Sequence, residues 1–428
     1  MNREQYLDQV CAHVHFKDVH PQIRWEIGAH FDDIMEDCLS KGLALKDAGE
    51  EAIRRLGDPS EVGRQLEKTH RPKVEWGLLV ITMMLLGVGL TVLFSLQHAL
   101  LVKDQMVFNQ TLSLSIPAII IFGLLAYHDY YRLQDYSYRL FFLILGLMLL
   151  VCIFGTRVHG AVPCLNIGSV VIDFISASPG ILAICLAGIF SRSNWTWNLR
   201  GFHTGLVLLG LPLMLYLGAT SMASVLLYSF LFLVLALISG VKPWYGLSYA
   251  TAIVFPLLAG LFTQPFRMNR LMAFLHPYTS ALADGFYYIQ LQNIASNSNL
   301  FGYGARVPMG IQDFHSNFIF AYVLNSFGWI AGILLISLAL LLLTRLFYTA
   351  FIIRERFGFL LITGIASVFL FQYSWNILMN VGLLPIFAVP LPFISFGSSQ
   401  FVVQLALLGL VMSVYRRKNI DRHQAASS

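Results

Sequence analysis

A short polar segment stands directly before a long apolar stretch in this chain of 428 residues. It reads QDFHSNF over residues 312–318 and brings together a carboxylate (Asp313), an imidazole (His315), a hydroxyl (Ser316) and an amide (Asn317). On a helix, Asp313 and Asn317 would lie on one face, one turn apart. A carboxylate there can act as a general base or can simply stabilise the positive end of the helix dipole. The first interpretation makes the protein an enzyme, and the second does not.

A second segment, residues 380–400 (NVGLLPIFAVPLPFISFGSSQ), combines prolines with apolar side chains. Proline lacks a backbone donor and cannot continue a helix, yet the segment is too apolar for an ordinary solvent loop. Non-helical backbone at membrane depth survives only where protein or a watery cavity satisfies its polar groups. We therefore expect a re-entrant segment that lines a cavity, with a tightly packed hairpin as the alternative. Ser395, Gly397, Ser398 and Ser399 then offer small hydrogen-bonding surface to a ligand or another element.

The composition defines the class of protein. Hydrophobic residues make up 57% of the chain and charged residues 12%, whereas a soluble domain usually carries about twice that share of charge. The net charge of +5 needs no nucleic-acid partner, because basic residues at membrane edges account for it. The five cysteines have no paired spacing, which argues against a disulfide framework or a zinc site. We expect a membrane protein with neither a metal nor a cofactor.

Ten apolar stretches are candidates to cross a hydrocarbon core that requires about 20 helical residues. They are residues 76–96, 112–127, 139–154, 170–190, 202–217, 219–239, 244–262, 317–347, 357–383 and 400–415. The second, third and fifth are short. The sequence therefore predicts an all-α, polytopic integral membrane protein with about ten transmembrane helices over residues 76–415.

Basic residues are unevenly distributed between the two sides of this predicted bundle. If the N-terminus is inside, the inner side holds Arg132, Arg139, Arg192, Arg200, Lys242, Arg345, Arg354, Arg356, Arg416, Arg417, Lys418 and Arg422. The outer side holds Lys103, Arg157, Arg267, Arg270 and Arg306. This imbalance agrees with the positive-inside rule, so we expect both termini, including a basic tail over residues 416–428, to be cytoplasmic.

Residues 1–73 are predicted to form a separate cytosolic bundle of helices. A stripe of apolar residues recurs every three or four positions, as in an amphipathic helix: Ile23, Ile27, Phe31, Ile34 and Cys38. Gly42 and Gly57 are interpreted as helix ends, and Asp58-Pro59 as the N-cap and first residue of a further helix. The stretch EAIRRLGDPSEVGRQL resembles the small helical prefix domain of several bacterial permease-like proteins. A regulatory or docking role and an inert tail both fit this unit.

A long outer segment, residues 264–314, separates the seventh and eighth predicted spans. Loops of this length are usually functional or disordered. The stretch MAFLHPYTSALADGFYYIQLQ within it is amphipathic and rich in Tyr and Phe. We expect it to lie on the membrane surface.

Three motifs in the C-terminal half lie in order along the chain: FRMNRLMAFLHP, HSNFIFAYVLNSFGWIAG and GLLPIFAVPLPFISFGSS. They resemble the outer loop, the start of the following span and the signature of the SEDS family, the bacterial cell-shape, division and sporulation proteins of the FtsW/RodA/SpoVE group. The resemblance implies a protein of the bacterial plasma membrane. It also implies polymerisation of glycan from lipid II, an undecaprenyl-pyrophosphate-linked precursor, beside a class B penicillin-binding transpeptidase.

The family's catalytic aspartate belongs to a His-Thr-Asp-Phe motif, which here reads His315-Ser316-Asn317-Phe318. Glycosyl transfer needs a base to take the proton from the attacking hydroxyl, and an amide cannot accept it near neutral pH. The resemblance therefore implies that Asn317 occupies the catalytic position without being able to act as a base. The family's next acidic pair is also replaced, by Asn325-Ser326.

Other residues could supply the missing chemistry. Asp313 is the candidate for a relocated base, and Asp284 in the outer segment is a second. Arg267 and Arg270 are the candidates to bind the pyrophosphate, because guanidinium forks match phosphate oxygens; simple anchoring at the membrane interface is the alternative. His315, Ser316 and the small residues from Ser395 to Ser399 complete the predicted substrate site.

Three functions stay open from the sequence. A SEDS-like protein of peptidoglycan synthesis, cell division or cell shape would hold lipid II, and would polymerise it only if Asp313 or another carboxylate acts. A transporter of lipid-linked precursors would need the cavity but no base. A non-catalytic scaffold would dock the synthetic machinery.

Overall fold

The computed structural model describes residues 2–70, 74–100, 107–157, 162–167, 170–192, 198–262, 265–280, 285–305 and 314–418. The chain divides into two compact units. One contains residues 1–75 with 415–428, and the other contains residues 76–414. The two are called the prefix unit and the membrane unit below, and each has its own core.

The prefix unit is a helical bundle: α1 (Arg3–Ala12), η1 (Lys17–Val19), α2 (His20–Ser40), α3 (Leu45–Leu56) and α4 (Pro59–His70). Residues of the predicted apolar stripe, including Ile23, Phe31 and Cys38, are buried on α2. The helices end where the sequence predicts, because Gly42 and Gly57 adopt φ values of +86° and +91° that favour glycine after a helix. A hydrogen bond from the Leu43 N–H to the Cys38 carbonyl closes the end of α2.

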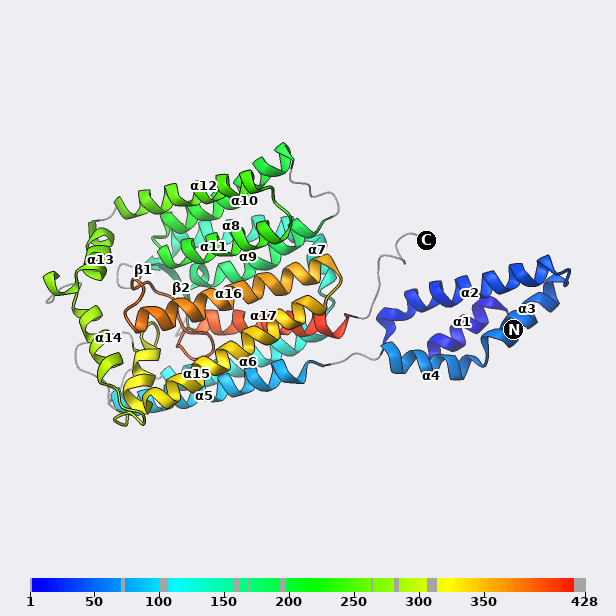
Figure 1. The fold of residues 1–428 in the computed structure, drawn as a ribbon, viewed down its shortest axis with the longest axis horizontal. Coiled ribbons are helices and arrows are strands. Elements are labelled where there is room, and N and C mark those ends of the chain that lie inside the picture. Colours follow the sequence, from blue (N-terminus) through cyan, green and yellow to red (C-terminus); the bar gives the residue numbers. More distant parts are fainter. Residues whose placement is uncertain are drawn as a thin grey trace. The chain divides into compact units, whose positions relative to one another are not determined.

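The membrane unit is built from long helices that run side by side (Figure 1). They are α5 (Trp76–Leu100), α6 (Val107–Tyr127), α8 (Ser137–Phe154), α9 (Phe174–Ser191), α10 (Leu199–Gly218), α11 (Met222–Ile238), α12 (Pro243–Phe262), α15 (Ile319–Ile352), α16 (Arg356–Asn380) and α17 (Ser398–Arg416). Each predicted span corresponds to one of them. Among the described residues, seven are long and apolar enough to cross a membrane, and two shorter apolar helices accompany them. The prediction of an all-α polytopic membrane protein is confirmed.

Short strands occur before α9, between the predicted spans over residues 139–154 and 170–190 and at the start of the second of these. β1 (Thr156–Arg157), β2 (Pro163–Ile167) and β3 (Val170–Ile172) form an antiparallel sheet in this order. The predicted span over residues 170–190 therefore begins four residues too early. The β-branched run of β3 fits a strand better than a helix, and the carboxylate of Asp173 caps α9 by accepting a hydrogen bond from the Ser176 N–H at 2.9 Å.

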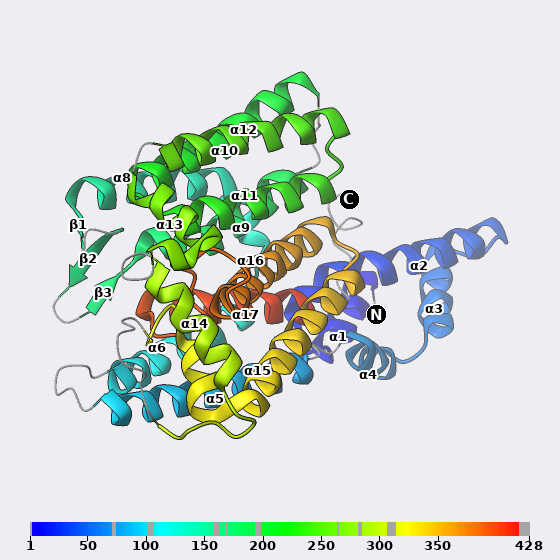
Figure 2. The same ribbon diagram turned by 60° about the vertical axis from the view of Figure 1, so that its left-hand side comes forward.

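The described part of the outer segment forms α13 (Pro265–Leu275), η3 (Pro277–Ser280) and α14 (Gly285–Asn297) at one end of the bundle (Figure 1). Figure 2 shows α14 beside α15, which it contacts. Tyr288, Leu291 and Ile294 of α14 are buried. The apolar face of α14 therefore covers protein, and the position of this stretch at the membrane surface stays a prediction.

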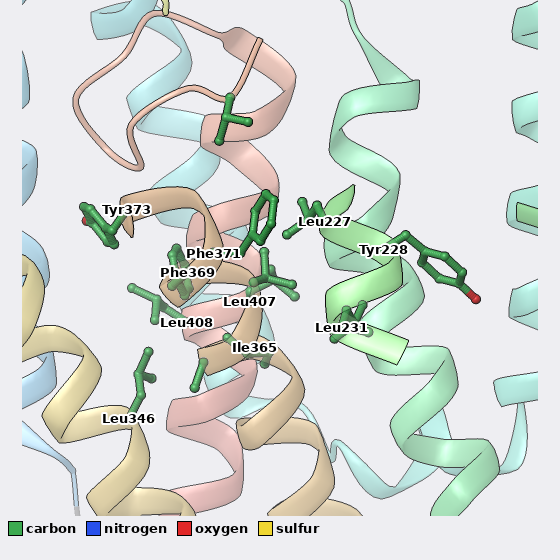
Figure 3. Packing of buried hydrophobic residues seen from close by; sticks show 14 of the residues in the cluster. Leu227, Tyr228, Leu231, Leu346, Ile365, Phe369, Phe371, Tyr373, Leu407 and Leu408 are labelled. Atoms are coloured by element: carbon green, nitrogen blue, oxygen red, sulfur yellow. The ribbon is translucent and has the colours of Figure 1, made fainter. Parts of the chain in front are cut away.

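Helix α16 lies at the centre of the membrane unit and is buried along most of its length. Figure 3 shows its side chains Ile365, Phe369 and Phe371 among residues of three other helices. Those neighbours are Leu227 and Leu231 on α11, Leu346 on α15, and Leu407 and Leu408 on α17. Helix α16 is therefore packed against α11, α15 and α17 in the middle of its length.

Helix α15 is broken at Gly328, where φ is +81° and ψ is −178°. The break separates Trp329 N–H and Ile330 N–H from their helical acceptors, the carbonyls of Asn325 and Ser326. Residues 299–304 bond all four groups. The carbonyls of Asn325 and Ser326 accept from the N–H groups of Tyr303 and Gly304 at 2.9 and 3.1 Å. The N–H groups of Trp329 and Ile330 donate to the carbonyls of Asn299 and Leu300, each at 3.1 Å. Backbone hydrogen bonds thereby join residues 299–304 to both sides of the break, and these four groups are all paired.

Candidate functional site

The turn that carries Asn317 immediately precedes α15, and two buried asparagines of α16 hold it in place. The Nδ2 groups of Asn376 and Asn380 each donate to the Asn317 carbonyl at 3.1 Å. Both asparagines have no solvent-exposed surface, and their i, i+4 spacing places them on one face of the helix. The position of Asn317 is therefore set from the core of the bundle.

The same two amides connect the turn to its neighbours. Asn376 Nδ2 also donates to the Val389 carbonyl at 2.6 Å, and Asn380 Oδ1 accepts from the Ala321 N–H at 3.3 Å. One pair of side chains thus joins α16, the start of α15 and the re-entrant segment. Sequence reasoning assigned these residues no role; polar amides one turn apart near the end of an apolar span were the available signal.

The segment between α16 and α17 folds back into the bundle as the sequence predicts, and its backbone is bonded to side chains of the neighbouring helices. Tyr373 Oη donates to the Pro392 carbonyl at 3.3 Å, and Trp375 Nε1 to the Pro385 carbonyl at 3.2 Å. The Phe393 N–H donates to Gln404 Oε1 at 3.1 Å. This satisfies the condition for irregular backbone inside a membrane protein.

His315 and Ser316 meet the re-entrant segment through their carbonyl groups. The His315 carbonyl accepts from the Phe396 N–H at 2.7 Å, and the Ser316 carbonyl accepts from Ser395 Oγ at 2.6 Å. Ser395 Oγ in turn accepts from the Leu391 N–H at 2.8 Å. The structure therefore brings these predicted site residues together but engages the Ser395 hydroxyl in holding the turn.

The remaining small residues of the predicted site begin α17. Ser399 Oγ accepts from the Asp173 N–H and donates to the Asp173 carbonyl, both at 3.1 Å, which ties α17 to the start of α9. Gly397 has open space where a side chain would project. Ser398 begins the helix, and its side chain lies outside the described part of the structure. Another element thus approaches at Ser399, whereas Gly397 faces open space.

A cavity of about 140 Å³ brings two of the predicted site residues together. Its lining consists of Arg270, Tyr287, Tyr288, Asn317, Phe318, Ile386, Phe387 and Ala388. The ring of Tyr287 stacks on that of Phe318 with centroids 5.9 Å apart. Tyr288 Oη donates to the Arg270 carbonyl at 3.4 Å and accepts from the Ile386 N–H at 3.0 Å. Helices α13 and α14, the Asn317 turn and the re-entrant segment therefore build one site.

The polar groups of this cavity are a guanidinium, phenol groups and an amide. Arg270 forms no ion pair with any described residue, and the side-chain amide of Asn317 forms no hydrogen bond within the described part of the chain. No carboxylate lines the cavity among the described residues. Such a set can bind an oxyanion or a sugar hydroxyl by hydrogen bonds but offers no base.

Some predicted site residues fall outside the description. Asp313 and Asp284 lie outside the described residues altogether. Arg267 belongs to α13, but its side chain is not described. Their proposed roles remain predictions.

Comparisons with known proteins agree with this architecture. The family model of FtsW, RodA and SpoVE, described as a cell cycle protein, matches residues 76–420. A probable peptidoglycan glycosyltransferase FtsW of Thioalkalivibrio sp. (strain K90mix) is 29% identical over 292 residues, covering 65% of this chain and 73% of that protein. The peptidoglycan glycosyltransferase MrdB of Escherichia coli (strain K12) is 24% identical, covering 67% of this chain and 80% of MrdB.

Two solved structures share the fold. One chain comes from work on the structural coordination of polymerization and crosslinking by a peptidoglycan synthase complex; it has a TM-score of 0.69 and 21% identity, covering 81% of this chain and 99% of that one. The rod shape determining protein RodA of Thermus thermophilus has a TM-score of 0.62 and 21% identity, covering 81% of this chain and 98% of RodA. At these identities the likeness establishes the fold alone.

Proposed function

Because the chain belongs to the FtsW/RodA/SpoVE family of cell cycle proteins, the SEDS family, we propose that it binds lipid II or a related undecaprenyl-pyrophosphate lipid at the cavity of Arg270 and Asn317. In this proposal the protein serves peptidoglycan synthesis as a lipid-binding member of the synthetic complex and does not polymerise glycan. The observation that carries the proposal is the cavity itself, where an arginine without an ionic partner among the described residues and an amide face one space.

The chemistry of the cavity suits a pyrophosphate and the first sugar of a lipid-linked precursor. A guanidinium binds phosphate oxygens through paired hydrogen bonds, and the rings of Tyr287 and Phe318 offer an apolar wall for a sugar face. Pockets for drug-sized molecules usually measure about 300–1,000 Å³. A cavity of about 140 Å³ therefore has room for part of a head group, while the polyprenyl chain would lie in the membrane.

The absence of polymerisation follows from the chemistry of an amide. Asn317 is held by Asn376 and Asn380, so the residue in the family's catalytic position is well placed to touch substrate. A carboxamide can donate to or accept from a sugar hydroxyl, but it cannot carry away the proton. Asn317 is therefore a binding residue in this proposal.

Partners and orientation complete the proposal. The family relationship and the likeness to a chain of a peptidoglycan synthase complex support a class B penicillin-binding transpeptidase as partner, bound through the outer segment or the membrane helices. The distribution of Lys and Arg supports a cytoplasmic position for both termini. No specific observation favours a transport role.

The test is a comparison of lipid II binding with glycan polymerisation by the purified full chain, alone and with a candidate transpeptidase. We expect binding without polymer. A positioned base contributes about 10²–10⁴-fold to rate, so any activity regained by Asn317→Asp would stand clearly above background; we expect little, because the following acidic pair is also missing. Strong wild-type polymerisation that is lost in Asp313→Ala would establish the relocated base. Strong polymerisation indifferent to Asp313, or no binding of lipid II, would overturn the proposal.

A further inference from the structure

A second cavity, of about 470 Å³, lies at the other end of the membrane unit. Its lining comes from the end of α11 (Ile238, Ser239, Gly240) and from the turn between α15 and α16 with the start of α16 (Ile353, Arg354, Arg356, Phe359, Leu360). Helix α15 begins next to the Asn317 turn and ends next to this cavity, and its part after the break at Gly328, residues 329–352, is about 36 Å long at 1.5 Å per residue. The cavity and the Asn317 turn therefore lie at opposite ends of α15.

The charges of this cavity are both positive. Arg354 and Arg356 are exposed, and neither forms an ion pair with a described residue. Arg356 Nη2 donates to the Ser239 carbonyl at 3.3 Å, which occupies one of its five N–H groups. Lys242 follows the lining residue Gly240 by two positions and adds further positive charge nearby.

The one acidic residue of the turn, Glu355, forms no ion pair with these arginines and bonds neutral groups instead. The Glu355 carboxylate accepts from the N–H groups of Phe357 and Gly358 at 2.6 and 2.5 Å, and from Tyr130 Oη at 3.3 Å. It is therefore used as the cap of α16. The arginines on either side of it in sequence keep their capacity to bind an anion.

The rest of the lining is apolar. Among its lining residues, Ile353 and Leu360 are buried and Ile238 is 42% exposed. A site for a free phosphate ion has no need of such a wall, whereas a phospholipid presents a phosphate next to its glycerol and acyl chains. Basic pockets between membrane helices on the cytoplasmic side are a recurring form of lipid head-group site.

From these observations we propose that the cavity of Arg354 and Arg356 binds the phosphate group of an anionic phospholipid of the cytoplasmic leaflet. The two guanidinium groups bind the phosphate oxygens, and Ile238 and Phe359 contact the chain region. This site is independent of the one proposed at Asn317, since the two lie at opposite ends of α15.

The probe is phosphatidylglycerol, compared with phosphatidylcholine, added to the purified full chain and followed by native mass spectrometry. We expect selective retention of phosphatidylglycerol, reduced roughly fivefold by Arg354→Ala, in keeping with the contribution of one basic residue near an anionic lipid surface. Arg354→Ala/Arg356→Ala should reduce it further, and Arg354→Lys should retain much of it. Arg139→Ala is the matched control, because this exposed arginine is also on the predicted cytoplasmic side but does not line the cavity.

Arg356→Ala also removes the hydrogen bond to Ser239, so a loss in the double variant alone could reflect a disturbed α11. Arg354→Ala avoids this problem, since its guanidinium has no partner among the described residues. Equal retention of both lipids, or retention of phosphatidylglycerol unchanged by Arg354→Ala, would overturn the proposal. Displacement of the lipid by millimolar inorganic phosphate would also overturn it, because it would assign the cavity to a soluble anion.

Discussion

The prefix unit and the membrane unit satisfy their polar groups by opposite means. Every ion pair between two described residues lies in the prefix unit, within residues 3–67 of the sequence. Most of the paired side chains are substantially exposed. In the membrane unit, neutral groups such as Asn376 and Asn380 are buried and bind backbone carbonyls. Burying a charged side chain costs much free energy because the charge loses its hydration. Burying a neutral amide costs less.

This difference teaches how to interpret the arginines of the membrane unit. In the prefix unit, an exposed ion pair between an arginine and a carboxylate contributes little to stability. Arg270 and Arg354 have no such carboxylate among the described residues, and each lines a cavity. Unpaired charge beside a cavity therefore marks the positions where a ligand would supply the missing anion.

The largest effect is expected at Gly328, where the backbone of α15 packs directly against the backbone of residues 300–302. A Cβ at position 328 would lie 2.3 Å from the Leu300 oxygen and 2.4 Å from the Gly302 nitrogen, at a φ of +81°. Gly328→Ala should destabilise the membrane unit by about 2–6 kcal/mol, because left-handed backbone and overpacking each cost about 1–3 kcal/mol. Thermal unfolding in detergent, followed by tryptophan fluorescence, measures this.

Gly87→Ala is the control for that experiment. A Cβ added at Gly87 on α5 would have no neighbour within 4 Å beyond its own stretch of helix, so the change should be neutral or slightly stabilising. Equal destabilisation by both substitutions would show that the junction between residues 299–304 and α15 contributes nothing particular.

The next effect tests the buried amides. Asn376→Ala removes the donor to the Val389 carbonyl and one of the two donors to the Asn317 carbonyl. An unsatisfied buried polar group costs about 1–3 kcal/mol, so we expect a loss of about 1–3 kcal/mol in unfolding free energy together with weaker lipid II binding. Asn293→Ala, on the exposed face of α14, should leave both unchanged. A variant that unfolds like the wild type would contradict the role assigned to the amide pair.

A smaller effect is expected at the unpaired arginine of the first cavity. Arg270→Ala should weaken lipid II binding about tenfold, or about 1.4 kcal/mol, and leave the unfolding temperature unchanged because no described residue pairs with this guanidinium. Arg270→Lys should restore charge without the paired geometry and give an intermediate affinity. Equilibrium binding of labelled lipid II reports both. Unchanged affinity in Arg270→Ala would assign this residue to anchoring at the interface.

The smallest effect is expected in the prefix unit, which we predict to fold alone. Hydrogen bonds from Lys41 and Arg55 lower the pKa of Asp37 below 3.8, and those from Arg54 and Arg55 lower the pKa of Glu51 below 4.5. Because the folded state lowers these values, the stabilisation is complete above about pH 5 and is lost as the pH falls through the folded pKa values. The melting temperature of residues 1–73, followed by circular dichroism, should therefore fall in acid.

Asp37→Asn should lower that melting temperature by at most a few degrees at pH 7 and weaken its acid dependence, since exposed pairs contribute little. Asp33→Asn is the control, because Asp33 is exposed and forms no ion pair with a described residue. An isolated unit without helical signal or a cooperative melt would refute independent folding. A large loss in Asp37→Asn would break the contrast between the two units.

Much of this fold could be predicted because membrane and cap signals are local. A run of about 20 apolar residues can do little other than span, and Gly42, Gly57 and Pro59 mark helix boundaries through their own backbone preferences. The prolines between 385 and 392 likewise excluded a helix. The presence of Arg270 and Asn317 at one cavity was expected only through the resemblance to the SEDS family.

What could not be predicted depends on distant partners. Gly328 sits within an apolar stretch in which only Asn325-Ser326 are polar nearby, and the backbone of residues 299–304 pairs the groups that the helix break leaves open. Ser395 and Ser399 have the composition of a ligand site, yet the carbonyl of Ser316 and the backbone of Asp173 engage their hydroxyls. Composition shows that such a group can bind something, and the fold decides what.

The break in α15 also has a mechanical consequence. Four backbone hydrogen bonds fasten residues 299–304 to both sides of Gly328, and fewer than ten residues of helix lead from there back to Ile319, next to the Asn317 turn. A displacement of residues 299–304 would be transmitted to that turn, because hydrogen bonds and continuous helix connect the two. A partner domain that binds residues 299–304 would therefore act on the cavity without contacting it.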